Sequence, residues 1–325
     1  MNRRGTNVVL RLFLGIVPVL TAPYLQATKL QVGTNIWTGF EPIYLAREKG
    51  LLAPDRFNLK EYETSQDVQR AFKNGSLDVA FLSLDEGLAL IELGVDAQFF
   101  LALDFSTGGD AVVARPSRQA VQPGSIKGKR VGLEVNGTGA FLLSRMLRKQ
   151  GLSQKDLTVF NLDSTEHLTA FKQGKVDLVV TYEPHISQLK KAGGQVVFDS
   201  NQVPEEIMDV ALVRKDRIQE KKTNLRELAR VWCLTLDKFY LDTKGVPILR
   251  TAKHEARFAV RAVRFEYFKL LGCDENKRLF SEAEPRIVDK INQIGTQMVS
   301  DGLIRKQMNW GGLVYRDALV DTVDD

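Results

Sequence analysis

The sequence is poor in the residues and motifs that most enzymatic and metal chemistry requires. Its 325 residues include only two cysteines and three histidines. The patterns G-x-S-x-G and H-E-x-x-H and the Walker loop do not occur in it. We therefore predict a protein that is not an enzyme and that has no catalytic residue, no cofactor and no metal. The two cysteines, Cys233 and Cys273, are either a disulfide, which an oxidising compartment would allow, or two buried thiols.

A large excess of positive charge is also missing. The net charge is +5 and no basic stripe occurs, so nucleic acid is not an expected partner. Residues 1–27 have a basic start, an apolar stretch from Leu12 to Leu20 that is too short to span a bilayer, and a small-residue exit at Ala27. This pattern predicts a signal peptide, and Arg11 and Pro18 disfavour the alternative of an amphipathic first helix of a cytosolic protein. Removal of the signal peptide lowers the net charge to +2. Because no Cys follows that exit, we expect a periplasmic protein without a lipid anchor.

The most informative feature present is an internal repeat. The segment SQDVQRAFKNGSLDVAF begins at Ser65, and STEHLTAFKQGKVDLVV begins at Ser164, an offset of 99 residues. The same offset aligns Val32-Gly33 with Val131-Gly132. A repeat of this length indicates two similar structural units.

Each unit alternates short apolar runs with amphipathic stretches, which is typical of parallel strands covered by helices. In the first unit we expect strands at Leu30–Asn35, Asn58–Glu63 and Val79–Leu82, and helices at Pro42–Lys49, after Ser65 and before Gly94. In the second unit we expect strands at Arg130–Val135, Leu157–Leu162 and Val176–Thr181, and helices at Ala140–Lys149, after Ser164 and at Pro184–Lys191.

The chain after about Leu212 is expected to be mostly helical and to pack on the first unit. Three- and four-residue apolar spacing predicts helices at Asn224–Leu241, Lys253–Leu271 and Glu284–Asp301. The chain would then cross between the units twice, near Asp104–Asp110 and near Glu206–Leu212, and two crossings make a hinge. The predicted fold is α/β, with two pseudo-symmetric Rossmann-like lobes: residues 28–106 and 211–325 form lobe 1, and residues 107–210 form lobe 2.

The ligand site is expected between the lobes. Ligands of parallel sheets bind beyond the carboxyl ends of the strands, where loops and helix N-termini converge. The predicted ligand-binding residues follow those strands or lie at the crossings: Trp37, Thr38, Ser83, Asp104, Ser106, Asn136, Thr138, Tyr182, Glu183 and Asp209.

Several of these residues also have an explanation without a ligand. Trp37 is either a stacking platform or a ring packed between loop and core. Thr138, between two glycines, either lies in a loop whose amides bind an anion or carbonyl, or caps the next helix. Ser83 and Glu86 form a capping box, which explains both of them. Glu183 either contacts the ligand or favours the dipole of the following helix.

The predicted cleft is acidic. Asp104, Asp110 and Asp209 lie at the crossings, although at least one of them is expected to be a turn former. Together with Glu183 they would give the cleft a negative side, and the predicted cleft loops contain no Arg or Lys. This composition favours a zwitterion or an amine over an inorganic anion.

Five segments together resemble the nitrate/sulfonate/taurine-type substrate-binding proteins of ABC importers, which have the type II periplasmic binding fold. The resemblance runs from about Leu30 to Lys215. It implies that Trp37, Ser83, Thr138 and Tyr182 contact the ligand and that a membrane permease and its ATPase are partners. The segments are GTNIWTGFEPIYLAREKGLL, GSLDVAFLSLDEGLAL, SIKGKRVGLEVNGTGAFLLSRMLRKQGL, FKQGKVDLVVTYEPHISQL and VVFDSNQVPEEIMDVALVRKD.

We therefore expect a monomeric periplasmic solute-binding protein that captures a small polar organic molecule, such as an aminosulfonate or aminopyrimidine, by hinge closure. One alternative is a sensory protein that signals to a receptor. The other is an enzyme like those of pyrimidine synthesis, which the scarcity of His and Cys disfavours. His167 falls opposite Val68 of the first unit, so a surface or core role is expected for it.

Overall fold

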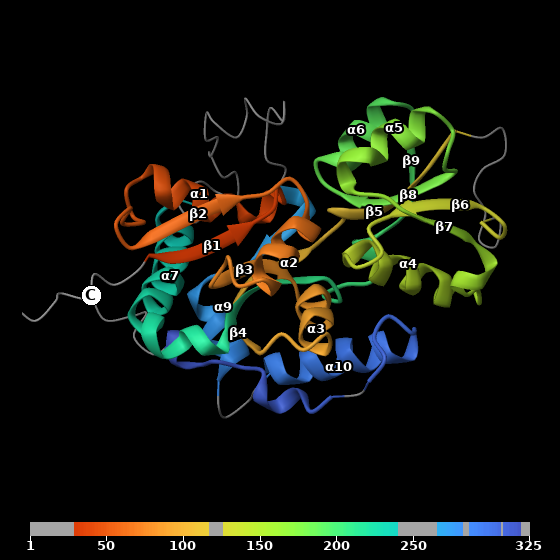
Figure 1. The fold of residues 1–325 in the computed structure, drawn as a ribbon. Helices are drawn as coiled ribbons and strands as arrows, with labels where there is room; N and C mark the ends of the chain where they lie inside the picture. Colours follow the sequence, from red (N-terminus) through yellow and green to blue (C-terminus); the bar gives the residue numbers. More distant parts are fainter. Residues whose placement is uncertain (1–28, 117–125, 240–264, 282–285, 307, 320–325) are drawn as a thin grey trace, which may run out of the picture.

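The computed structural model describes residues 29–116, 126–239, 265–281, 286–306 and 308–319. The expected signal peptide and most of the helix expected at Lys253–Leu271 lie outside these ranges. Two β-sheets lie side by side, each covered by helices, and we call them with their helices lobe 1 and lobe 2 (Figure 1). The α/β fold of two lobes is therefore confirmed.

The sheet of lobe 1 has six strands in the order β11-β4-β10-β3-β1-β2. Strand β1 pairs in parallel with β2 and β3, whereas β10 is antiparallel to both β3 and β4. The bounds are β1 Leu30–Thr34, β2 Phe57–Glu61, β3 Val79–Ser83, β4 Ala97–Ser106, β10 Met208–Arg214 and β11 Phe268–Leu270.

The sheet of lobe 2 has five strands in the order β7-β6-β8-β5-β9. Here β6 pairs in parallel with β7 and β8, and β5 is antiparallel to β8 and β9. The bounds are β5 Asp110–Ala114, β6 Arg130–Leu133, β7 Thr158–Asn161, β8 Leu178–Tyr182 and β9 Gln195–Asp199.

The repeat in the sequence is a repeat in the structure. Strands β3 and β8 start 99 residues apart and hold the same central place in their sheets. In each sheet an antiparallel strand, β10 in lobe 1 and β5 in lobe 2, directly follows a passage from the other lobe. The chain makes the first passage between β4 and β5 and the second between β9 and β10.

The second passage ends earlier than the sequence suggested. Strand β10 begins at Met208, so the expected lobe boundary at residue 211 falls inside it. Asp104 and Asp209 are strand residues that face each other across β4 and β10, rather than residues of connecting turns. These segments form strands because they are apolar. Their sequences are AQFFLALDFS and MDVALVR, and both are almost fully buried in the sheet.

The helices cover both sheets, and the C-terminal helices pack on lobe 1. Helix α7 contacts α1, α9 contacts β4, and α10 contacts α3 (Figure 1). The bounds are α1 Glu41–Glu48, α2 Ser65–Lys73, α3 Leu84–Glu92, α4 Thr138–Lys149, α5 His167–Lys172, α6 His185–Lys191, α7 Ile218–Phe239, α9 Cys273–Phe280 and α10 Arg286–Ser300.

The prediction of a helix at Lys253–Leu271 is wrong for the C-terminal end of that range. Phe268 to Leu270 form β11, because pairing with β4 gives that sheet edge a partner and buries Phe268.

Cys233 on α7 and Cys273 on α9 form a disulfide, which decides between the two alternatives for the cysteines. No helix among the described residues is both long enough and apolar enough to cross a membrane.

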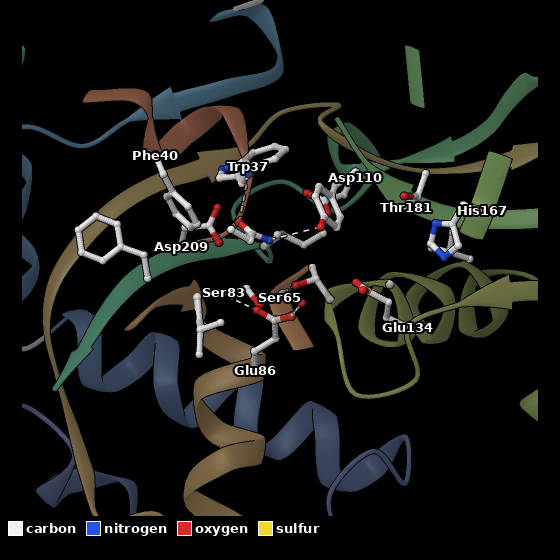
Figure 2. A pocket seen from close by; sticks show the side chains of 18 residues that line it. Trp37, Phe40, Ser65, Ser83, Glu86, Asp110, Glu134, His167, Thr181 and Asp209 are labelled. Carbon is white, nitrogen blue, oxygen red and sulfur yellow. Dashed lines mark hydrogen bonds between the residues drawn. The ribbon is translucent and has the colours of Figure 1, made fainter. Parts of the chain in front are cut away.

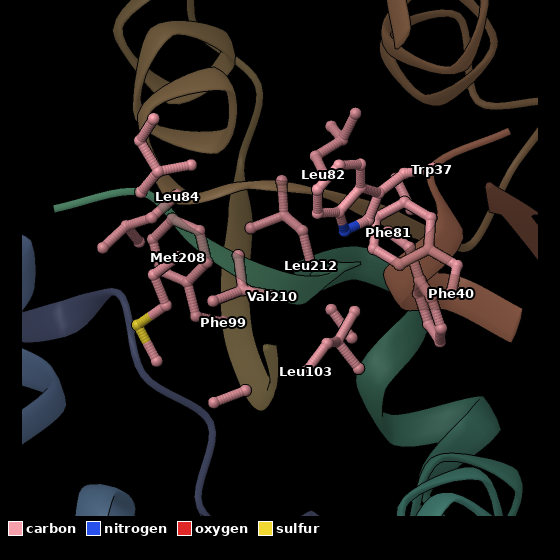
Figure 3. Close-up of a cluster of buried hydrophobic side chains, with 14 of the residues drawn as sticks. Trp37, Phe40, Phe81, Leu82, Leu84, Phe99, Leu103, Met208, Val210 and Leu212 are labelled. Carbon is pink, nitrogen blue, oxygen red and sulfur yellow. The ribbon is translucent and has the colours of Figure 1, made fainter. Parts of the chain in front are cut away.

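The core of lobe 1 reaches the floor of the cleft. Phe81 on β3, Phe99 on β4 and Leu212 on β10 are fully buried in one cluster that also contains Trp37 and Phe40 (Figure 3). Because this floor is close-packed, the residues at the cleft ends of β3, β4 and β10 are held in fixed positions.

Candidate ligand-binding cleft

A cavity lies between the two lobes at the carboxyl ends of their parallel strands (Figure 2). Its free space is about 30 Å³, which is room for about two water molecules. The lobes are therefore closed on each other in this conformation. Lobe 1 contributes Asn35, Trp37, Phe40, Ser65, Phe81, Leu82, Ser83, Glu86 and Asp209, lobe 2 contributes Asp110, Glu134, Thr138, Gly139, His167, Val180, Thr181 and Tyr182, and Ile207 comes from the second passage.

A row of paired residues across three strands of the lobe 1 sheet lies at one edge of the cavity. Asp209 pairs with Ser83 on one side and with Asp104 on the other, so three neighbouring strands place polar side chains at one level. The carboxyl groups of Asp104 and Asp209 hydrogen-bond to each other, and such a bond requires a shared proton. Burial raises the pKa of Asp104 to about 7 and raises the pKa of Asp209 well above its usual value.

Trp37 joins this acidic row to the core. Its Nε1 donates to both carboxylate oxygens of Asp104, at 3.3 and 3.2 Å. Its ring stands edge-on to Tyr182 and Phe268, at centroid distances of 6.3 and 5.9 Å. Trp37 is 5% exposed, so it is a packed ring that also lines the cavity rather than an open stacking platform.

Glu86 is held by lobe 1 through both carboxylate oxygens. Its Oε1 accepts from Ser65 Oγ at 2.6 Å and from Gln69 Nε2 at 3.2 Å, while its Oε2 accepts from the Ser83 amide at 3.2 Å. The last bond is part of the expected capping box of α3. Burial raises the pKa of Glu86.

Two further carboxyl groups reach the cavity from lobe 2. Glu134 follows the last residue of β6, and Asp110 is the first residue of β5. Burial raises the pKa of Glu134 to about 8, with a smaller contribution from the charge of Glu86. Burial likewise raises the pKa of Asp110 to about 7. Four acids therefore line the cavity, and none of its described lining residues is Lys or Arg.

Direct hydrogen bonds join the two lobes. Thr138 Oγ1 donates to Ser83 Oγ at 2.6 Å, and Gln69 Nε2 donates to the Asn136 carbonyl at 3.2 Å. The side-chain Nδ2 of Asn35 donates to the Tyr182 hydroxyl at 3.4 Å. A solute larger than the present space must separate at least some of these partners.

Half of the ten predicted site residues line the cavity: Trp37, Ser83, Thr138, Tyr182 and Asp209. The other five do not. Thr38 is buried in a short 3-10 helix, and Asn136 is exposed. Asp104 lies behind Trp37, and Ser106 bonds to Ser200 at 2.8 Å. The Glu183 carboxylate turns back to accept from Ser187, which is the helix-start role foreseen as its alternative.

Other lining residues were not selected from the sequence. Glu134 occupies the place of Asn35 in the repeat, so the offset of 99 residues could have identified it as a strand-end polar residue. His167 was expected to be a surface or core residue, and it is both buried and in the cavity wall. Thr181 lies within β8, where no loop signal marks it.

The two sheets, each with an antiparallel strand that follows a passage from the other lobe, and the cavity at the facing strand ends are the arrangement of the type II periplasmic binding fold. Residues 25–238 match the model of the NMT1-like family, and the chain belongs to that family. This agrees with the resemblance to substrate-binding proteins of the nitrate/sulfonate/taurine type.

Individual relatives are distant. The taurine-binding periplasmic protein of Escherichia coli (strain K12) is 22% identical over 211 residues, which cover 63% of this chain and 65% of that protein. The alkanesulfonate-binding protein SsuA from Xanthomonas axonopodis pv. citri, solved with bound MOPS, superposes with a TM-score of 0.66 at 18% identity, over 89% of this chain and 98% of that one. The desulfurization enzyme DSZB superposes with a TM-score of 0.62 at 12% identity, over 90% and 98% of the two chains. These structures show a shared fold, which is used both for binding and for catalysis.

Proposed function

We propose that the protein is the periplasmic solute-binding component of an ABC import system and that it catalyses no reaction. The two-lobed fold, the family and the taurine- and alkanesulfonate-binding relatives support this role. The disulfide between Cys233 and Cys273 supports an oxidising compartment such as the periplasm. In this role its partners are a membrane permease and its ATPase, and the binding protein acts as a monomer.

We further propose that the ligand is a small amine-bearing or zwitterionic organic molecule. The observation that carries this proposal is the acidic lining of the cavity, with Asp110, Asp209, Glu86 and Glu134 and no lining Lys or Arg among the described residues. An anionic ligand would have to approach buried carboxylates without a compensating cation, which is unfavourable. A cationic group can take the place of the protons that these carboxyl groups hold in the closed cleft.

The binding mechanism follows from the position of the cavity. The lobes are joined by two passages, one after β4 and one before β10, and a ligand that contacts both lobes stabilises the closed arrangement. The interlobe bond between Thr138 and Ser83 contributes to the same arrangement. Closure would then present both lobes together to the permease.

A thermal-shift screen of the mature protein tests the ligand class. The panel contains primary amines, aminosulfonates, aminopyrimidines, simple sulfonates and small inorganic anions. A ligand well above its dissociation constant should add about 2 to 4 kcal/mol to the free energy of unfolding. Stabilisation by amine-bearing solutes alone supports the proposal, whereas stabilisation by inorganic anions alone would overturn it.

A further inference from the structure

The lobe 2 wall of the cavity includes three residues with hydrogen-bond acceptors. Glu134, His167 and Thr181 lie together at one end of the cavity, and Asp209 lies at the other end (Figure 2). We infer that this wall is the subsite for the amine of the ligand, an inference that rests on the function proposed above. In it the Glu134 carboxylate, His167 Nδ1 and Thr181 Oγ1 accept the three N–H bonds of a primary ammonium group.

The geometry of His167 fixes the role of its two nitrogens. Nε2 lies 3.2 Å from the carbonyl oxygen of Leu162, and a carbonyl only accepts, so Nε2 carries the proton. In the neutral ring Nδ1 is then an acceptor. The side chain is 1% exposed, and within the described part of the chain its Nδ1 has no partner. Burial, and secondarily His185, lower the pKa of His167 to about 3, which keeps the ring neutral.

Thr181 is the second group without a partner. Its residue is 3% exposed, and its Oγ1 has no hydrogen-bond partner among the described residues. Leaving a buried hydroxyl unpaired is unfavourable, and native structures do so rarely. A ligand group that donates to both Thr181 and His167 removes two such costs at once.

Glu134 supplies the charge. Its Oε1 accepts from the Ser164 amide at 3.2 Å. A carboxylate has about four acceptor sites, so its contacts with the backbone and side chain of Ser164 leave capacity for a ligand. The residue stands directly after β6, and its side chain is close enough to Glu86 for their charges to interact.

The three acceptors match the donors of one chemical group. A primary ammonium group has three N–H donors and no acceptor, whereas a quaternary ammonium group has the same charge and no donor. A trimethylated amine would leave His167 and Thr181 unpaired, and a site built to hydrogen-bond discriminates strongly against an analogue that lacks the donors. The subsite therefore selects N–H bearing cations over their methylated forms.

Calorimetric titration with two matched pairs of probes tests this inference. The pairs are ethanolamine with choline, and taurine with N,N,N-trimethyltaurine. We expect the primary amine of at least one pair to bind wild-type protein about tenfold or more tightly than its methylated partner. Binding of the methylated form with equal affinity would overturn the inference while leaving the proposed function intact. If no amine of either pair binds, both the inference and the proposed ligand class fail.

Two substitutions of His167 separate binding from folding. His167→Gln can keep a donor to the Leu162 carbonyl but loses the Nδ1 acceptor, so ethanolamine or taurine affinity should fall about tenfold with little change in Tm. His167→Asn can place an amide oxygen near the position of Nδ1 but loses the bond to Leu162, so Tm should fall and amine affinity should be largely kept. The reverse pattern would contradict the inference.

Thr181→Val provides an independent variant. It removes a buried hydroxyl that has no partner among the described residues, so Tm should stay constant or rise. Amine affinity should fall several-fold because one acceptor is lost. An unchanged preference for ethanolamine over choline in Thr181→Val and in His167→Gln would show that the discrimination arises elsewhere.

Discussion

Thr138 Oγ1 donates a hydrogen bond of 2.6 Å to Ser83 Oγ, and the two residues stand at the starts of helices in opposite lobes. The bond can exist only when the lobes are closed. Ser83 is also the N-cap residue of α3, where its backbone amide donates to Glu86 Oε2 at 3.2 Å, so one residue serves both the fold of lobe 1 and the contact between the lobes.

Thr138→Val should weaken ligand binding without unfolding the protein. The substitution keeps the shape of the side chain and removes one interlobe hydrogen bond, which is worth about 0.5 to 1.5 kcal/mol. Affinity for the best amine of the screen should therefore fall about 2- to 13-fold in a calorimetric titration. Thr158→Val, on the exposed strand β7, is the control. An equal loss of affinity in both variants would remove Thr138 from the closure mechanism.

Trp37→Phe should destabilise the protein more than a matched tryptophan substitution elsewhere. It removes the Nε1 donor from the buried carboxylate of Asp104 at a cost of about 1 to 3 kcal/mol. Trp310 is also buried, but its Nε1 has no hydrogen-bond partner in the described part of the chain. Trp310→Phe therefore loses similar volume without losing a bond. Urea denaturation that gave equal losses for the two variants would refute the role assigned to the Trp37 indole.

The stability of the ligand-free protein should fall as pH rises from about 6.5 to 9. Glu134 and Asp110 ionise near pH 4 in the unfolded chain, and burial raises their pKa values to about 8 and about 7. Their protonated forms therefore contribute stability that is complete below about pH 4 and lost as the pH rises through 7 to 8. The lowered pKa of His167 has its effect only below about pH 6.5.

Affinity for a primary amine should change in the opposite direction over this range. Deprotonated carboxylates attract the cation, so ethanolamine should bind more tightly at pH 8.5 than at pH 6.5 and should release protons on binding. Thermal unfolding with and without ethanolamine at several pH values measures both trends. An affinity that did not depend on pH would contradict the assignment of the cavity carboxyls to the cation.

A second interlobe contact, remote from the cavity, should also control closure. Asp301, just after α10, accepts from Ser144 Oγ at 2.7 Å and lies 2.6 Å from Arg148 Nη2, and both of these partners are on α4 of lobe 2. Its side chain is only 8% exposed, so this contact is less screened than a surface ion pair. Asp301→Asn should speed ligand release several-fold in stopped-flow measurements.

The control for Asp301 is Glu227→Gln. Glu227 pairs with Arg230 on the same helix, α7, and does not join the lobes. Its removal should leave the release rate unchanged. If both variants release ligand at the wild-type rate, the contact between α10 and α4 has no part in closure.

The repeat made the two lobes predictable, because strand β3 and its counterpart β8 keep the same sequence spacing and the same place in their sheets. It could not reveal that β4 and β10 are strands. Their apolar runs fall at the passages between lobes, and pairing across β4 and β10 joins segments more than a hundred residues apart. The same tertiary pairing places Asp104 behind the cavity and Asp209 in its wall.

The site was only partly predictable for a related reason. Ser83, Thr138 and Tyr182 follow or end strands, where sequence position alone indicates a cleft. His167 and Thr181 do not: the first starts a helix opposite an apolar residue of the first unit, and the second lies inside a strand. Their role depends on which buried polar atoms lack a partner, and that property appears only once the lobes are packed together.

Small-angle X-ray scattering of the mature protein, with and without the best amine of the screen, tests the central claim most directly. The ligand-free protein should be more open, and its radius of gyration should decrease on saturation with the amine. A radius of gyration that stayed the same at saturation, with binding verified by calorimetry, would contradict ligand-driven closure of the two lobes.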